Sequence, residues 1–135
     1  KLNALIKSLK DHKKWLKLSG NIAFKNLHLL YKEADIGIFA SSCENMPNIL
    51  LEKMASGLPI ACSNKGPMPE ILGDSGIYFN PEDFLDIANK LKILIQSKKL
   101  RESYSIASYQ KSKKYSWESC ADQTLNFINN VAKKY

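Results

Sequence analysis

Two acidic side chains lie where a predicted strand gives way to a predicted helix. Glu44 and Glu52 bracket a polar loop and the apolar residues that follow it. Before them, Ala34 to Ala40 is a short apolar run with β-branched residues, the pattern of a strand buried on both faces of a parallel sheet. Ligands of open α/β sheets bind at the carboxyl ends of the strands. The sequence therefore predicts a ligand site at this junction.

The chemistry of that site follows from a helix that starts near Pro47 or Asn48. The first backbone N–H groups of a helix lack partners within it, and the helix dipole favours an anion there. Side chains lean toward the helix N-terminus, so we expect Glu52 to face the loop that carries Glu44. Two carboxylates can accept from hydroxyl groups while the amides donate to phosphate, which suits a sugar nucleotide. At helical spacing, the expected buried face is Leu50, Leu51, Met54 and Ala55.

Two other interpretations fit the same residues. Acids are common in the first turn of any helix, so each carboxylate taken alone could be a cap or a solvated loop residue. From another functional class, a non-catalytic Rossmann-like module that binds a nucleotide or a partner protein would show the same scaffold. A dehydrogenase is not indicated, because the sequence has no G-x-G-x-x-G.

The E-x7-E spacing of Glu44 and Glu52 resembles the motif of the retaining GT-B glycosyltransferases, family 4 in particular. A sugar-nucleotide epimerase on the same GT-B scaffold would lack this motif. Four further segments are similar to the family's motifs: Tyr31 to Ser42, Leu51 to Ser63, Pro69 to Gly76 and Tyr115 to Trp117. The resemblance runs from about residue 16 to the C-terminus.

That resemblance implies transfer of a sugar from a nucleoside diphosphate sugar with retention at the anomeric carbon. It implies no metal ion and no cofactor, with a UDP- or GDP-linked sugar as the expected substrate. The expected catalytic residue is Glu44, which would hold donor-sugar hydroxyls and stabilise positive charge in the transition state. Glu52 would hold the ribose hydroxyls. The partners implied are this donor and a glycan or glycolipid acceptor, in bacterial surface polysaccharide or lipopolysaccharide synthesis.

The expected donor-binding loop is Asn45, Met46, Pro47 and Asn48, where family members more often carry small residues. Pro47 has no N–H, so donation to the diphosphate would come from the other three amides or from the Asn side chains. The identity of the donor stays open for this reason. The resemblance also implies contact between the nucleotide base and the backbone of Asn21 and Ile22, although Ile22 fits a buried connector equally well.

The expected fold is α/β, a Rossmann-like three-layer αβα sandwich with a short parallel sheet of about four strands and C-terminal helices. Residues 1–135 suit one domain. The resemblance makes it the truncated, donor-binding C-terminal half of a GT-B enzyme, whose acceptor would bind a missing N-terminal domain. We expect the chain alone to bind nucleotide weakly and to transfer nothing. Strands are predicted at 15–19, 36–39, 59–62 and 77–79, and helices at 1–10, from about 27 to 34, from 47 or 48, at 70–72, after 80–83, at 99–113 and at 117–134.

Charge is distributed unevenly along the chain. The net charge is +7, yet residues 35–86 hold eight acids against two lysines. A nucleic-acid binder would concentrate basic and aromatic residues over its site, so nucleic acid is not an expected partner. The basic ends suit solvated helix faces, with peripheral contact to an anionic membrane as the open alternative.

Cellular location and the remaining reactive residues follow from composition. No run of about 20 apolar residues occurs. The three cysteines, Cys43, Cys62 and Cys120, show no metal or redox spacing and are expected to be reduced, buried or half-buried thiols of a cytoplasmic protein. Four aromatic residues near the C-terminus are expected to be packing residues: Tyr104, Tyr109, Tyr115 and Trp117.

Overall fold

Three short parallel strands form the centre of the computed structural model, which describes residues 6, 8, 9 and 11–134. The strand order is β1-β2-β3, and Ile60 of β2 pairs with Gly37 of β1 and Gly76 of β3. The elements are α2 (His12–Trp15), α3 (Phe24–Glu33), β1 (Gly37–Phe39), α4 (Asn48–Ala55), β2 (Ile60–Ser63), α5 (Met68–Leu72), β3 (Gly76–Phe79), α6 (Phe84–Gln96), α7 (Lys98–Ser112) and α8 (Trp117–Ala132).

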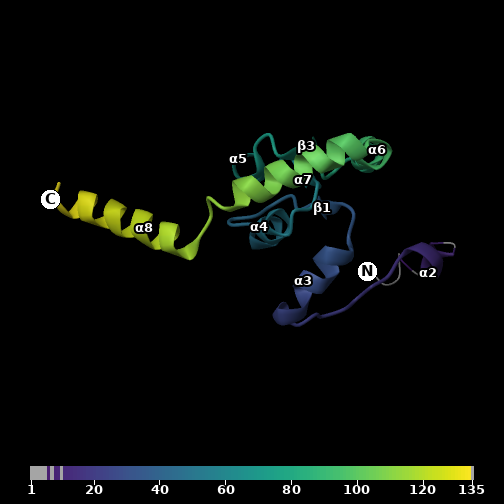
Figure 1. Cartoon of the computed structure of the whole chain (residues 1–135), viewed down its shortest axis with the longest axis horizontal. Helices are drawn as coiled ribbons and strands as arrows, with labels where there is room; N and C mark the ends of the chain where they lie inside the picture. Colours follow the sequence, from purple (N-terminus) through teal and green to yellow (C-terminus); the bar gives the residue numbers. More distant parts are fainter. Residues whose placement is uncertain (1–5, 7, 10, 135) are drawn as a thin grey trace.

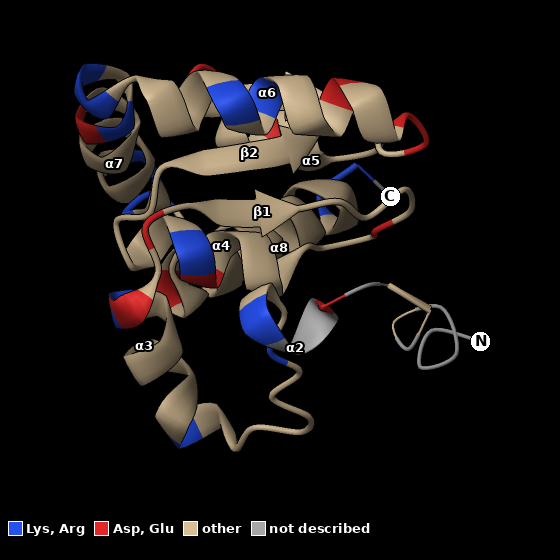
Figure 2. Ribbon diagram, turned by 90° about the vertical axis from the view of Figure 1, so that its right-hand side faces the viewer, with Lys and Arg blue, Asp and Glu red and all other residues tan. Residues whose placement is uncertain are grey.

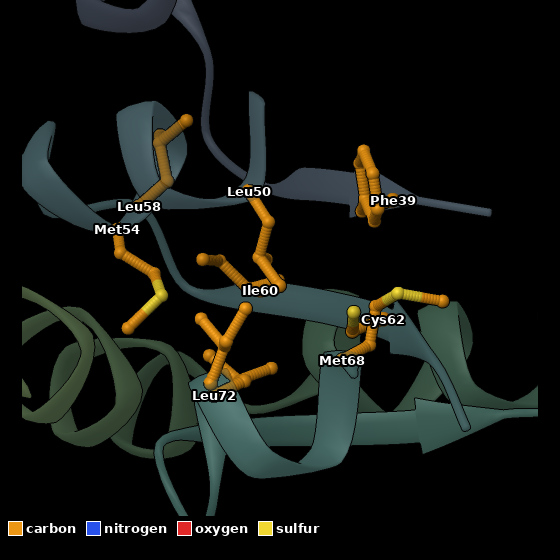
Figure 3. Close-up of a cluster of buried hydrophobic side chains, with 9 residues drawn as sticks. Phe39, Leu50, Met54, Leu58, Ile60, Cys62, Met68 and Leu72 are labelled. Atoms are coloured by element: carbon orange, nitrogen blue, oxygen red, sulfur yellow. The ribbon is translucent and has the colours of Figure 1, made fainter. Parts of the chain in front are cut away.

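Helices cover both faces of this sheet. Ile60 and Cys62 of β2 belong to a core cluster with Leu50 and Met54 of α4 (Figure 3). Ala61, between them on β2, belongs to a second cluster built with Phe79 of β3 and with residues of α6 and α7. Successive strand residues point to opposite faces, so this division gives a layer of helices on each side. The predicted three-layer αβα arrangement is confirmed.

Helix α4 begins and ends as the sequence predicts. It starts at Asn48, and Gly57, the residue after the C-cap Ser56, adopts a φ of +69°, the left-handed conformation that glycine adopts without steric cost. The amide of Gly57 donates to the carbonyl of Met54 (3.0 Å), which satisfies one of the last carbonyls of the helix. Leu50 and Met54 are buried as expected, but Leu51 is half-buried and Ala55 is exposed.

The sheet has three strands among the described residues, not about four. The predicted strand at 15–19 is wrong, because Trp15 ends α2 and residues 16–20 are neither helix nor strand. Its alternating pattern has no neighbouring strand to pair with, and an unpaired strand leaves its backbone groups without partners. The predicted burial of β1 on both faces is wrong as well, since Ile38 is 42% exposed. The helix predicted at 1–10 falls largely outside the described residues.

The last two helices differ in how they pack. Helix α7 lies against α4, and Ser105 donates a hydrogen bond of 2.6 Å to the carbonyl of Gly57. Helix α8 extends away from the rest of the molecule (Figure 1), and none of its residues is buried. The hydroxyl of Ser116 accepts from the amide of Ser119 (3.1 Å) and caps the start of α8.

Lys and Arg positions are spread along the ribbon over several helices in the view of Figure 2, including α3, α4, α6 and α7. Across the described part of the chain, every helix is too short or too polar to cross a lipid bilayer.

Candidate functional site

The loop between β1 and α4 carries most of the residues that the sequence singled out. Pro47 is buried and occupies the N-cap position of α4, with its carbonyl accepting from Leu50 (2.9 Å) and Leu51 (3.2 Å). The amide of Asn48 donates to the carbonyl of Met46 (2.9 Å). A turn of the loop therefore engages this amide, while donation to a ligand by the amides of Asn45 and Met46 or by the Asn side chains stays a prediction.

Glu52 lies in the second turn of α4 and is half-buried. One of its carboxylate oxygens, Oε2, accepts a hydrogen bond of 2.8 Å from the hydroxyl of Tyr31 on α3. Burial, this hydrogen bond and the charge of Glu52 together raise the pKa of Tyr31 to about 12. The phenol is therefore a protonated donor throughout the neutral range.

The neighbour of Glu52 ties α4 to the sheet. Lys53 donates from Nζ to the carbonyl of Ile38 (2.8 Å), and its ammonium group lies 5.3 Å from the centre of the Phe39 ring. Burial lowers the pKa of Lys53, while Cys62 and Glu52 oppose that shift. The contact caps a backbone carbonyl on the outer side of β1, the kind of group that edge strands leave unpaired.

A pocket of about 690 Å³ opens at the N-terminus of α4. Asn48, Leu51 and Glu52 of α4 line one side together with Met46 of the loop, and Phe24 of α3 also contributes. The opposite lining comes from the α7–α8 junction and the first turns of α8: Lys114, Tyr115, Ser116, Trp117, Ser119, Cys120, Gln123 and Thr124. Its volume falls within the range of about 300–1,000 Å³ that is usual for small-molecule sites.

Only part of the predicted site lines this pocket. Met46, Asn48 and Glu52 do, whereas Glu44, Asn45, Asn21 and Ile22 are not among its lining residues. Glu44 is half-buried in the loop, and a Cβ added to Gly66 would lie 3.8 Å from its carbonyl oxygen. Asn45 and Asn21 are exposed, and Ile22 is half-buried in the segment before α3. The loop of Glu44 thus lies beside the turn that follows β2.

Sequence reasoning missed two residues that line the pocket, Phe24 and Trp117, and one hydrogen-bond partner of a lining residue, Tyr31. The helical spacing of Tyr31 indicated only a buried face of α3, so its hydrogen bond to Glu52 was not foreseen. Phe24, the first residue of α3, carried no signal of its own. Trp117 was expected to be a packing residue, and that prediction is wrong, because it is 85% exposed and lines the pocket. The sequence carried no signal of this exposure, because it follows from the way α8 extends away from the core.

The thiols differ from the prediction as well. Cys62 is buried as expected, but Cys43 and Cys120 are exposed and all three are free. Among the described residues, no three His, Cys, Asp or Glu side chains gather closely enough to hold a metal ion.

The parallel sheet with helices on both faces, and a loop after β1 that leads into the N-terminus of α4, define an α/β protein of the open-sheet class. Residues 1–97 match the family model described as glycosyl transferases group 1, and the chain belongs to that family.

Named relatives and a solved structure agree with this assignment. The O-antigen chain mannosyltransferase B of Escherichia coli is 31% identical over 83% of this chain and 29% of its own length. The sulfoquinovosyl transferase SQD2 of Arabidopsis thaliana is 29% identical over 80% of this chain and 22% of its own length. A sucrose-phosphate synthase structure from Thermosynechococcus elongatus superposes with a TM-score of 0.84 over 99% of this chain and 34% of its own, at 17% identity.

The structural likeness confirms the fold as that of a GT-B glycosyltransferase fragment. The chain spans less than a third of the length of these two curated relatives.

Proposed function

We propose that this chain is the donor-binding part of a glycosyltransferase that moves a sugar from a nucleoside diphosphate sugar to a glycan or glycolipid acceptor. Membership of the group 1 family supports the reaction class. The observation that carries the proposal is the pocket at the N-terminus of α4, where Glu52 lies with Met46 and Asn48. A carboxylate accepts from hydroxyl groups, and a helix N-terminus favours the anionic diphosphate.

In this proposal the nucleoside occupies the pocket. The ribose hydroxyls donate to Glu52, and the base reaches toward Asn21 and Ile22. Phe24 supports this placement of the base, because it lines the pocket and lies two residues beyond Ile22. Because the amide of Asn48 is engaged within the loop, the diphosphate is held by the amides of Asn45 and Met46, by Asn side chains and by the α4 dipole.

Glu44 is the proposed catalytic residue. The bond from the anomeric carbon to the phosphate oxygen breaks, a bond to the acceptor oxygen forms on the same face of the sugar, and the proton of the acceptor hydroxyl passes to the departing diphosphate. Positive charge builds on the sugar ring meanwhile, and a nearby carboxylate stabilises it. Positioning and electrostatics supply the catalysis, without a metal ion or cofactor.

The proposal extends to the acceptor and the cellular role. We assign acceptor binding to a part of a longer protein outside this chain, because the matched relatives extend well beyond it. A role in bacterial surface polysaccharide or lipopolysaccharide synthesis is supported by the relative named for the O-antigen chain. Peripheral contact with an anionic membrane, through the lysines near the chain's ends, belongs to the same proposal.

Saturation-transfer NMR tests the donor. The full-length protein is presented with UDP-, GDP- and ADP-linked sugars in turn, and the protons that receive saturation identify the base and the sugar. We expect strong transfer to the ribose and base protons of one nucleotide. Equal and negligible transfer to all three would contradict the proposal.

Two substitutions separate the roles of the acids. Glu52→Gln should raise KM for the donor with little change in kcat, because ribose contacts are made equally in the ground and transition states. Glu44→Gln should lower kcat by about 10²- to 10³-fold, the scale of removing one electrostatic stabiliser. Glu102→Gln, an exposed acid on α7 paired with Lys98, is the matched control and should change neither constant. Unchanged kinetics in both site variants would favour the non-catalytic module instead.

A further inference from the structure

The hydrogen bond between Tyr31 and Glu52 joins two helices that are not consecutive in the chain. Tyr31 lies in the last turns of α3 and Glu52 in the second turn of α4, 21 residues later. At 2.8 Å between the phenol oxygen and Oε2, the bond has a neutral donor and an ionised acceptor, which makes it stronger than a bond between two neutral groups.

This bond restricts what the carboxylate can do. A free Glu side chain samples several rotamers and loses that freedom when it binds a ligand. With Oε2 held by Tyr31, the carboxyl plane is fixed before any ligand arrives, and Oε1 remains to accept from one. Among the described residues, Tyr31 is the hydrogen-bond donor that the structure gives to this carboxylate. Since Glu52 lines the pocket, the fixed group is in the right place to meet a ligand.

We propose that Tyr31 is a positioning residue, which orients the Glu52 carboxylate so that Oε1 accepts from the ribose hydroxyls of a bound nucleoside diphosphate. The inference rests on the proposed function, because it requires a ribose in this pocket. Tyr31 also packs against the core cluster between α4 and the sheet. A purely structural role for its ring is therefore the competing explanation, and the test must separate the two.

Tyr31→Phe keeps the ring in the core and removes only the hydroxyl. We compare binding of UDP and GDP with binding of their 2′,3′-dideoxy counterparts, by calorimetry on the full-length protein. If Tyr31 acts through Glu52 on the ribose, the substitution should weaken ribonucleotide binding by about tenfold, in the range of coupling between contacting groups. The dideoxy nucleotides lack the hydroxyls, so their affinity should change less than about twofold.

Kinetics and a double substitution give independent readouts. Tyr31→Phe should raise KM for the donor while kcat stays unchanged, the pattern of lost uniform binding. In a Glu52→Ala background, adding Tyr31→Phe should have no further effect on ribonucleotide affinity, because the carboxylate through which it acts is gone. A full additional loss in that background would overturn the proposal.

Tyr78→Phe is the matched control. It removes another phenol hydroxyl, one that donates to the carbonyl of Gly73 (2.6 Å), and Tyr78 does not line the pocket. It should leave nucleotide affinity unchanged. If Tyr31→Phe weakens ribo- and dideoxynucleotides equally, Tyr31 is structural and this inference fails while the proposed function stands. If the unmodified protein shows no preference for ribose over dideoxyribose, the proposed function fails and takes the inference with it.

Discussion

The hydroxyl of Ser108 donates a hydrogen bond of 2.9 Å to the backbone carbonyl of Leu58, a residue 50 positions earlier in the chain. Both residues are buried. Leu58 lies between α4 and β2, and Ser108 lies on α7, so the bond ties the helix that carries Glu52 to the helix that precedes the far wall of the pocket.

Ser108→Ala removes the partner of that buried carbonyl. We expect the free energy of unfolding to fall by about 1–3 kcal/mol, the cost of leaving a buried polar group unsatisfied. Urea denaturation measures it. Ser103→Ala, at an exposed position of the same helix, controls for helix propensity and should be neutral or slightly stabilising. Equal effects of the two substitutions would show that the Ser108 bond contributes nothing.

Replacing either of two buried glycines at strand starts with alanine should change stability, but in different directions. A Cβ on Gly76 would lie 2.6 Å from the carbonyl oxygen of Ile60 and 2.7 Å from a methyl group of Leu72. Backbone cannot yield cheaply, so Gly76→Ala should destabilise by about 1–3 kcal/mol.

The matched control is Gly37→Ala. Its nearest contacts would be at 3.5 Å, to the side chains of Leu58 and Lys53, an ordinary van der Waals separation. We expect a change between zero and a gain of about 1 kcal/mol, because alanine reduces the entropy of the unfolded chain. Thermal denaturation ranks the two variants, and a Gly37→Ala variant as unstable as Gly76→Ala would contradict the packing argument.

Alkaline pH should weaken the fold through Cys62. Burial raises the pKa of this thiol to about 12 from an ordinary value of 9.0, against opposing effects of the Lys53 charge and a backbone hydrogen bond at Ser63. The folded state therefore holds the proton more tightly than the unfolded state. The resulting stability is complete below about pH 9 and is lost as pH rises toward 12.

Denaturation across that pH range measures the effect. Cys62→Ala should be less stable at neutral pH because of the cavity it creates, but its stability should fall less steeply above pH 9. Tyr31 changes stability in the same direction, since its pKa is also raised. Both the unmodified protein and Cys62→Ala contain Tyr31, so the difference between their slopes of stability against pH isolates Cys62. Parallel slopes would refute the assignment.

Two exposed thiols provide an internal test of where the donor binds. Cys120 lines the pocket and Cys43 does not, although both are exposed. A nucleoside diphosphate sugar at ten times its Kd should slow labelling of Cys120 by a thiol reagent by up to about tenfold, in proportion to occupancy. Labelling of Cys43 should change much less. Mass spectrometry of the labelled peptides reads both rates, and equal protection of the two thiols would place the ligand elsewhere.

Local signals in the sequence determined a large part of this protein. The start of α4 and its glycine stop at Gly57 were predicted correctly, because caps, turn residues and helical spacing act over a few neighbouring residues. The E-x7-E spacing of Glu44 and Glu52, together with four further segments, indicated a GT-B glycosyltransferase, and the match to the glycosyl transferases group 1 family agrees with that class. The assignment of roles to these acids stays a prediction.

Only the tertiary structure decided which residues meet. The segment at 15–19 has a strand's alternating pattern but no neighbouring strand in the part of the chain that the structure describes, and pairing is a property of two segments. Tyr31 reaches Glu52 across 21 positions, and Trp117 stays exposed on a helix that leaves the core. Local propensity carries no information about such contacts, because they depend on where distant elements pack. Sequence therefore determined the elements and the family, and packing determined the pocket and the partner that fixes its carboxylate.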